Sequence, residues 1–313
     1  TTGWTGDVSR CLAGDVSVDQ REASLRRING LRALAGVPGD VAYDGELNRR
    51  AQETALLMAA NDQIDHQPPS SWRCYTASAA SGAGQSNLAL GIQGAESIDG
   101  YLREPGASNF AAGHRRWILL PTTRHMGIGD AGTGENGGGS RTSALWVFDP
   151  APRGARPVPR DEFVAWPPRG HVPYPVVPAR WSFSWPGADF SGARVTVTEN
   201  GRALPVRLEP VAGGYGENTL VFLPGNLADS AAWPKPSVDT VYDVRITHVR
   251  IEAATRDFQY TVTVFDPEVA SGPAPSLQGA ARLTVGESAD YTITPMLGAA
   301  QYQWRSLTTE PYP

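Results

Sequence analysis

Apolar positions recur at helical spacing in four segments of the first 120 residues. Intervals of three and four residues predict an amphipathic helix over 21–36. A second helix is predicted to begin after Asp44, a favourable N-cap, and to run to about Ala59. Shorter helical patterns over 96–102 and 113–120 are each closed by a proline. These patterns predict a helix-rich beginning to the chain.

Strand patterns replace helical ones after residue 121. Alternating apolar positions predict strands over 125–130 and 142–149, joined as a hairpin by a glycine-rich tip over 132–139. Before them, the small polar residues 70–84 show no periodicity and predict a long surface loop. Residues 1–150 therefore predict an α+β domain with its helices first and a short antiparallel sheet late.

The character of the chain changes again after residue 150. Prolines crowd residues 151–180 and predict a stiff, extended connector. Period-two patterns at roughly ten-residue intervals over 181–268 then indicate an all-β, immunoglobulin-like sandwich, with a different antiparallel sheet as the alternative. Strands are predicted at 180–185, 194–199, 204–208, 218–223, 240–248 and 258–265. Asn200-Gly201 between two of them is a strong hairpin signal.

The last segment, 269–313, is predicted to be a linker followed by the first strands of an incomplete further β domain. Two or three strands cannot bury a face alone, which is why we expect the domain to be incomplete. The alternative is an ordered tail that completes the preceding sandwich.

Charge and hydropathy exclude two classes of partner. The 313 residues carry 27 basic and 32 acidic side chains for a net charge of −5, and Lys235 is the one lysine. A protein that tracks nucleic-acid phosphates is not expected from this balance. No apolar stretch approaches the roughly 18–20 residues that cross a bilayer, so no membrane span is predicted.

Two cysteines point to an oxidising compartment. Cys11 and Cys74 are compatible with one disulfide that closes a loop of about sixty residues and stabilises the fold by roughly 4 kcal/mol, the alternative being two unrelated buried thiols. The chain begins at Thr1 without methionine, as a trimmed mature protein would. Together with the preference for arginine over lysine, this predicts a protein secreted by a bacterium with a GC-rich genome.

Histidines are the first candidates for chemistry. Of the five in the chain, His66 closes the second predicted helix and His114 opens a later one. Polar groups at such termini can converge on a cleft, and a neutral imidazole suits both metal ligation and general-base work. The alternative for each is a hydrogen-bonded structural histidine.

Five motifs occur in a familiar order. They are Val41–Leu47 before an alanine-rich helix, His66, Gly84-Gln85-Ser86-Asn87-Leu88-Ala89, Gly113-His114-Arg115-Arg116-Trp117 and Gly127-Ile128-Gly129. Residues 20–150 therefore resemble the CAP superfamily, which includes the cysteine-rich secretory proteins, antigen 5 and the pathogenesis-related group-one proteins, and most of all its bacterial SCP-like members. The resemblance implies an αβα sandwich over residues 1–150.

The resemblance also implies a large cleft with two histidines and two acidic residues. The histidines fall on His66 and His114, and an aromatic-x-x-Glu pattern at Tyr101 makes Glu104 one acidic residue, with Glu96 and Asp99 as competitors. The family motif Gly-Glu-Asn-Leu/Ile-Ala corresponds to residues 84–89, which puts Gln85 at its glutamate. The implied cleft comprises His66, Gln85, Asn87, Glu104 and His114.

A glutamine at that position weakens the case for catalysis, because it can neither ionise nor balance the charge of a divalent cation. His66 and His114 alone fall short of the three protein ligands typical of catalytic zinc. His-Glu-x-x-His and Gly-x-Ser-x-Gly signatures are also absent from the sequence.

We therefore expect a secreted or cell-surface binding protein. Its ligand would be apolar, such as a lipid or sterol, or a cell-wall component, and its β domain a spacer or adhesion module. The alternative is an extracellular hydrolase of peptide, ester or glycan bonds that uses His66, His114 and Glu104, with zinc on the two histidines as its candidate cofactor. A purely structural adhesion protein is a third hypothesis.

Three other features have weaker functional interpretations. The tip Asp130–Asn136 contains oxygen ligands but not the spacing of a calcium loop, so a flexible tip is expected. Tryptophans 166, 181, 185 and 233 could form a carbohydrate-stacking surface, but core packing is favoured. The pair Arg115-Arg116 is expected on a solvated helix face.

Overall fold

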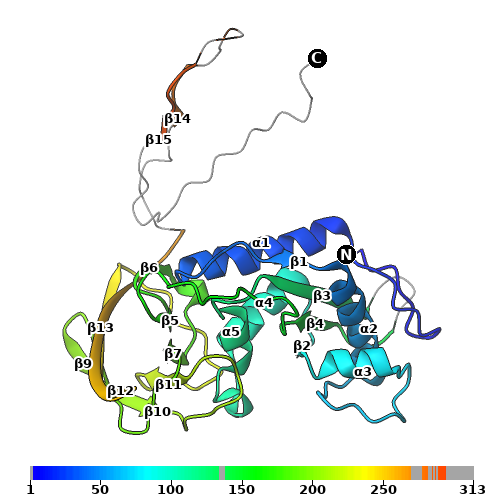
Figure 1. Ribbon diagram of the computed structural model, residues 1–313, viewed down its shortest axis with the longest axis horizontal. Helices are drawn as coiled ribbons and strands as arrows, with labels where there is room; N and C mark the ends of the chain where they lie inside the picture. The colour runs from blue at the N-terminus through cyan, green and yellow to red at the C-terminus, as the bar shows by residue number, and fades with distance from the viewer. Residues whose placement is uncertain are drawn as a thin grey trace.

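The computed structural model describes residues 3–133, 138–268, 277–280, 284, 286 and 288–293. A helix-rich first unit and a β-rich second unit lie side by side (Figure 1). Most of the predicted incomplete domain falls outside the described residues. Within its described part, β14 (Leu277–Gln278) pairs antiparallel with β15 (Thr292–Ile293). No helix in the described residues is long and apolar enough to cross a membrane.

The first unit contains five α-helices: α1 (Val18–Leu34), α2 (Gly45–Asn61), α3 (Ala77–Ala83), α4 (Gly94–Arg103) and α5 (Gly113–Ile118), with a 3₁₀ turn at Ala107–Asn109. Asp44 caps α2 as predicted, because its carboxylate accepts hydrogen bonds from the Glu46 and Leu47 amides. Helix α1 begins earlier than the apolar pattern indicated, since Ser17 provides its N-cap.

A four-stranded sheet lies between two helical layers, in the order β1-β3-β4-β2. Its strands are β1 (Ala42–Tyr43), β2 (Ser86–Leu90), β3 (His125–Ala131) and β4 (Thr142–Trp146). Met126 and Ile128 of β3 pack with residues of α1, α4 and α5, whereas Ala131 packs with α2 and α3. This layering is the expected αβα sandwich, and the β3–β4 hairpin is confirmed.

Helix α3 occupies half of the segment for which a long loop was predicted. Its small residues give no hydrophobic periodicity, but they allow a close approach to α2: a Cβ on Gly82 would lie 2.1 Å from Thr54 Oγ1. The Thr54 hydroxyl also donates a hydrogen bond to the carbonyl of Ala79. A disulfide between Cys11 and Cys74 links the segment that leads into α3 to the N-terminal strap, residues 3–16. It confirms the predicted pairing.

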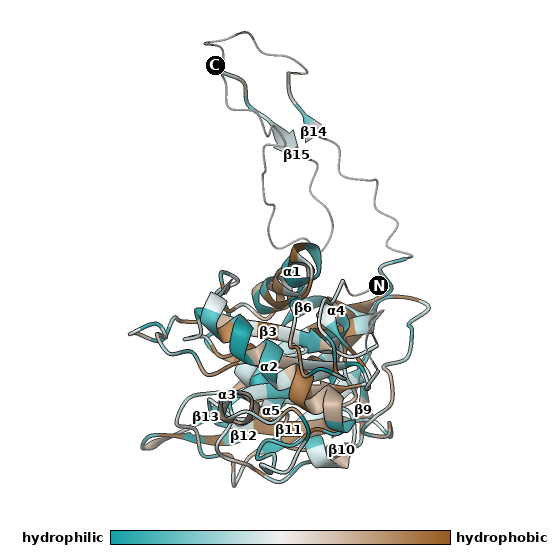
Figure 2. Ribbon diagram, turned by 90° about the vertical axis from the view of Figure 1, so that its right-hand side faces the viewer, coloured by the Kyte–Doolittle hydropathy of each residue, from teal (hydrophilic) through white to brown (hydrophobic). Residues whose placement is uncertain are grey.

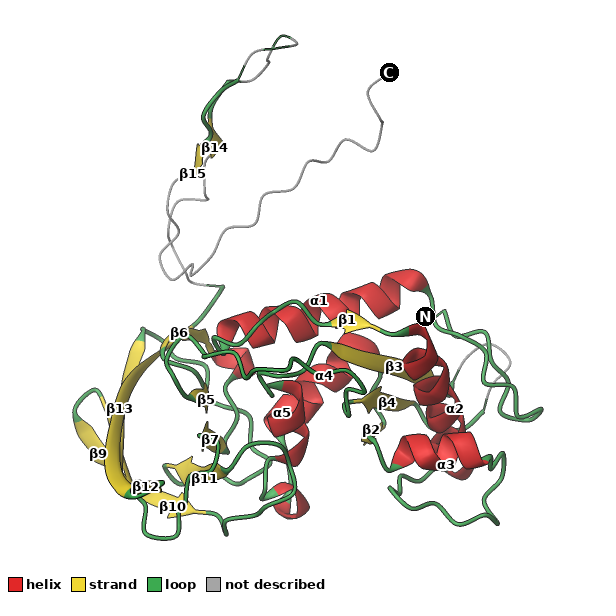
Figure 3. Ribbon diagram, viewed as in Figure 1, coloured by secondary structure: helices red, strands yellow, loops and turns green. Residues whose placement is uncertain are grey.

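The second unit consists of two sheets, shown as yellow arrows in Figure 3. One has the order β10-β11-β7-β5 and the other β6-β13-β12-β8-β9. The strands are β5 (Val164–Trp166), β6 (Gly170–Pro173), β7 (Trp181–Ser184), β8 (Arg194–Glu199), β9 (Arg202–Leu204), β10 (Val206–Leu208), β11 (Thr219–Pro224), β12 (Thr240–Ile251) and β13 (Ala254–Phe265).

Aromatic side chains join the two sheets across a shared core. The rings of Trp181 and Tyr242 lie 5.7 Å apart, and those of Phe183 and Phe258 lie 4.9 Å apart. Trp181 and Trp233 are buried there, so the core interpretation of these tryptophans is confirmed. Asn200-Gly201 joins β8 to β9 with positive φ at both residues, as its hairpin signal predicted.

The prediction of a simple connector over 151–180 needs correction. Strand β5 pairs with β7, β6 pairs with β13, and a 3₁₀ turn covers Tyr174–Val176. Both strands lie at sheet edges, where neighbouring prolines remove no ladder hydrogen bond. Figure 2 colours the ribbon by hydropathy, and helices such as α1 carry both hydrophilic and hydrophobic residues.

Strand β5 also joins the two units. Phe163 and Ala165 belong to the core between the two sheets, whereas Val164 and Trp166 belong to the core of the first unit. Because successive side chains of a strand point to opposite faces, one short strand contributes to both cores. The two units are therefore packed against each other rather than held apart by a linker.

Candidate functional site

Glu104 and His114 form a carboxylate–imidazole pair where α4 ends and α5 begins. His114 Nδ1 lies 2.8 Å from Glu104 Oε2, and the Arg115 amide donates to Glu104 Oε1 at 2.9 Å. Glu104 is fully buried and adopts a left-handed conformation that ends α4. Its competitors lie elsewhere: Glu96 pairs with Arg141, and Asp99 pairs with Arg27.

The pair changes the protonation of His114. Burial of the imidazole opposes its charged form, but the neighbouring Glu104 carboxylate outweighs burial through its charge and its hydrogen bond, and it raises the pKa of His114 above the ordinary value. A carboxylate on Nδ1 also fixes the orientation of the ring and leaves Nε2 as the remaining ring nitrogen. Tyr101 packs beside it, with the ring centroids 5.4 Å apart.

Two arginines hold the Glu104 turn in place. Arg115 donates through Nε to the carbonyl of Leu102 and through a terminal nitrogen to Ser182 Oγ. Arg180, from the second unit, donates to the carbonyl of Glu104 itself. Both guanidinium groups are fully buried. The site carboxylate is therefore positioned by residues of both units.

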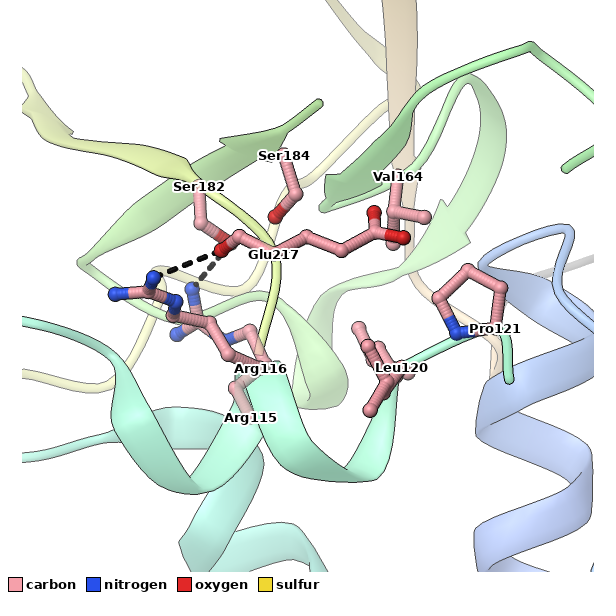
Figure 4. Close-up of a pocket in the computed structure, with 9 residues that line it drawn as sticks. Arg115, Arg116, Leu120, Pro121, Val164, Ser182, Ser184 and Glu217 are labelled. Atoms are coloured by element: carbon pink, nitrogen blue, oxygen red, sulfur yellow. Dashed lines mark hydrogen bonds between the residues drawn. The ribbon is translucent and has the colours of Figure 1, made fainter. Parts of the chain in front are cut away.

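The prediction that Arg115 and Arg116 lie on a solvated helix face is wrong, because the second unit buries both side chains. Figure 4 shows both side chains reaching from α5 toward the strands of the second unit, where Arg115 bonds Ser182 and Arg116 bonds the carbonyl of Glu217. The sequence shows two adjacent cations but not the neighbouring unit that buries them, so the interface could not be predicted from α5 alone.

His66 has a similar arrangement to His114. Its Nδ1 lies 2.8 Å from the carbonyl oxygen of Ala83. A carbonyl can only accept, so this bond requires the proton on Nδ1 and leaves Nε2 free of this contact. Each imidazole thus has one nitrogen engaged with an oxygen acceptor and one available.

His66 and His114 line one cavity of about 360 Å³. The other lining residues are Gly84, Ser86, Asn87, Ser108, Asn109, Ala111, Gly113, Trp117, Val147, Phe148, Gly214 and Tyr215. The rings of Trp117 and Phe148 lie 4.5 Å apart, and Phe148 is 42% exposed. Of the described residues that line the cavity, none is Asp, Glu, Lys or Arg.

Asn87 lines the cavity, but Gln85 does not. Asn87 is buried, and its side-chain amide donates to the carbonyl of His114. The Gln85 side chain instead donates to Ser81, on α3. Strand alternation would place residues 85 and 87 on one face, but Gln85 lies before β2 (Ser86–Leu90), so the alternation does not extend to it.

Ser86 takes the place in the cavity that was assigned to Gln85. Counted back from Asn87-Leu88-Ala89, the glutamate of the Gly-Glu-Asn-Leu/Ile-Ala motif falls on Ser86, one residue later than the glycine-anchored alignment gave. Its buried Oγ has no hydrogen-bond partner among the described residues. The position lacks a carboxylate in either alignment.

The residues present do not fit a resident zinc ion. Two imidazoles line the cavity, whereas catalytic zinc typically has three protein ligands. Within the described part of the chain, no group of three His, Cys, Asp or Glu side chains could hold a metal.

The prediction that Asp130 belongs to a flexible hairpin tip needs correction. Asp130 is buried in β3 and accepts hydrogen bonds from Gln20 and Gly94, while residues 134–137 lie outside the described part.

The aromatic wall of the cavity was not predicted. Trp117 follows the His114 motif by helical spacing and could have been found from it, since residues three apart share a helix face. Phe148 lies just beyond β4, and Tyr215 comes from the second unit. No signal in the sequence links Tyr215 to His114, because a hundred residues separate them.

Residues 25–149, less than half of the chain, match the sequence model of the cysteine-rich secretory protein family, CAP. The match covers α2 to β4 and includes His66, Glu104 and His114. No curated protein matches the chain.

Proposed function

Because residues 25–149 of this chain are a domain of the CAP family, we propose that the protein is an extracellular binding protein whose cavity takes a neutral, saccharide-like component of a cell wall. The observation that carries the proposal is the combination of aromatic rings with imidazole, amide and hydroxyl groups in one cavity. A disulfide supports an extracellular location, because such bonds persist in oxidising compartments.

The cavity lining favours a ligand with one apolar face and one polar edge. Trp117 and Phe148 offer ring faces, while Asn87 and the two imidazoles offer hydrogen-bonding groups. A sterol or lipid chain would cover the free imidazole nitrogens and the Ser86 hydroxyl without offering hydrogen bonds, at a cost of about 1–3 kcal/mol for each group that it buries unpaired. A sugar ring satisfies both kinds of surface, since its C–H face can stack on an aromatic ring while its hydroxyl and amide groups form hydrogen bonds.

The second unit would then serve as an immunoglobulin-like module that holds the binding domain at the cell surface. Its two facing sheets support this role in general terms. Its contacts with the first unit through Arg115, Arg116 and Arg180 support a fixed orientation between the two.

A hydrolase is the second candidate, and the Glu104–His114 pair favours it. A buried carboxylate that orients an imidazole is the arrangement that general-base catalysis uses. Turnover of a peptidoglycan fragment, an ester or a peptide by the protein, and its loss in His114→Gln, would support this candidate over simple binding.

Binding tests the proposal directly. The protein should co-sediment with purified insoluble peptidoglycan, and a soluble N-acetylglucosamine tetramer should compete. Phe148→Ala should weaken the interaction because it removes an exposed ring of the cavity. Trp72→Ala, which changes an aromatic outside this cavity, is the matched control. Binding to cholesterol-containing vesicles with none to peptidoglycan would overturn the saccharide assignment.

A further inference from the structure

A segment of the second unit reaches the cavity of the first. Residues 209–218 connect β10 to β11, and within them Gly214 and Tyr215 line the same cavity as His66 and His114. The first unit alone would therefore present a cavity that is open on this side.

Arg116 holds this segment on both sides of Tyr215. Its guanidinium donates to the carbonyl of Ala212 at 2.9 Å and to the carbonyl of Glu217 at 2.8 Å. It also lies 5.4 Å from the centre of the Tyr215 ring, within range of a cation–π contact. Figure 4 shows Arg116 directed at Glu217, whose carboxylate is itself paired with Arg156. The segment is thus fixed to α5, the helix that carries His114.

Gly113 makes room for the Tyr215 ring. A Cβ at position 113 would lie 2.6 Å from Tyr215 Cδ1, closer than real Cβ contacts come. Tyr215 therefore packs directly against the residue before His114. Its neighbours Gly214 and Gly216 have positive φ, a conformation that glycine adopts without strain and that turns the segment at this point.

We propose that the ligand site spans both units and that Tyr215 is its outer wall, which controls access to the His114 imidazole and determines which ligands enter. The class of ligand rests on the proposed function, whereas the wall rests on these contacts alone. Tyr215 is 39% exposed, so its ring faces both the cavity and the solvent. The second unit accordingly contributes to recognition as well as to attachment.

Chemical modification of His114 tests the wall without any ligand. Diethyl pyrocarbonate acylates unprotonated imidazole nitrogens, and peptide mapping by mass spectrometry gives a rate for each histidine in the intact protein. Tyr215→Ala should raise the rate at His114 several-fold, and Tyr215→Phe should leave it at the wild-type value. His248, exposed on the second unit, is the internal control. Rates followed over a range of pH separate a change in access from a change in the pKa of His114.

A second variant, Gly113→Ala, tests the Tyr215 wall independently of substitutions at Tyr215 itself. Gly113→Ala should displace the ring without deleting it and should also raise the His114 rate. Unchanged His114 rates in both Tyr215→Ala and Gly113→Ala would overturn the proposal.

Binding of the N-acetylglucosamine tetramer separates this proposal from the proposed function. Weaker binding by Tyr215→Ala than by Tyr215→Phe supports both. Faster modification in Tyr215→Ala with no binding by the wild type supports the wall and contradicts the saccharide assignment. Wild-type binding that Tyr215→Ala retains in full, together with unchanged modification rates, overturns the wall and leaves the saccharide assignment standing.

Discussion

The guanidinium of Arg180, in the second unit, donates a hydrogen bond to the backbone carbonyl of Glu104, in the first. The carboxylate of the same glutamate holds His114. The second unit is therefore connected to the candidate site through its polar contacts as well as through packing. Arg180 is a positioning residue for the pair, since it contacts the turn and not the cavity.

Arg180→Met should destabilise the whole protein. The arginine is fully buried and lies 3.3 Å from Glu209. Its removal leaves the buried Glu209 carboxylate with only the more exposed Arg207 as a charged partner. Losing one member of a buried pair costs about 3–5 kcal/mol. Urea unfolding measures this loss. Arg245→Met is the control, because its pair with Asp257 is largely exposed and should contribute about 1 kcal/mol or less. Equal losses in the two variants would contradict the assigned contribution of the buried Arg180 contacts to stability.

Glu104→Gln should lower the pKa of His114 below its ordinary value, because burial of the imidazole would then act without an opposing carboxylate. Histidine resonances followed by NMR against pH measure the change. The sign for stability follows from the raised pKa in the native protein. The pair's contribution is fully present below the unfolded-state pKa near 6.5 and is lost as the pH rises through the native pKa. A His114 pKa that does not move in Glu104→Gln would refute the coupling.

Parts of both units could be predicted because their signals are local. The Asp44 cap and the Asn200-Gly201 turn depend on a few neighbouring residues, and both are found where expected. Helix α3 was not predicted, because it contacts Thr54 through small residues and its sequence therefore shows no hydrophobic periodicity. Strand β5 was not predicted, because the surrounding prolines indicated a connector. Edge strands tolerate nearby prolines, and β5 is an edge strand.

Only the site residues that belong to the family motifs could be predicted from the sequence. Of the residues that the family resemblance implied, His66, Asn87 and His114 line the cavity, whereas Glu104 is buried behind His114 and does not line it. Gln85 was misplaced because one inserted residue shifts the motif so that Ser86 takes its place, and Gln85 itself lies before β2 and donates to Ser81. Tyr215 depends on the docking of the second unit, which no local pattern of the sequence encodes.

Ser86→Glu should create a zinc site, whereas Gln85→Glu should not. Ser86 lines the cavity with both imidazoles, so a carboxylate there would raise the protein donor set to three, the number typical of catalytic zinc. Gln85 is turned toward Ser81 and serves as the matched control. Calorimetric zinc titrations of both variants and the wild type decide the matter. Tighter zinc binding by Gln85→Glu than by Ser86→Glu would favour the glycine-anchored alignment of the motif.

The disulfide should make a measurable contribution to stability. Cys11 and Cys74 are 63 residues apart in sequence, and closing a loop of this length stabilises a fold by about 4 kcal/mol in the chain-entropy model. The double variant Cys11→Ala, Cys74→Ala should lose about that much in urea unfolding. Reduction of the wild type should produce the same loss and a mass increase of about two daltons. An unchanged unfolding free energy would show that the strap from residue 3 to residue 16 contributes nothing through this link.

The most direct test of the binding proposal is an NMR titration of the histidine resonances with a soluble N-acetylglucosamine tetramer. His66 and His114 line the cavity, while His125, His171 and His248 lie outside it and act as internal references. Saturable shifts of the His66 and His114 signals alone are expected, and they should be weakened by Phe148→Ala. Shifts confined to the other three histidines, or no shift at any ligand concentration, would contradict the assignment of this cavity to a cell-wall saccharide.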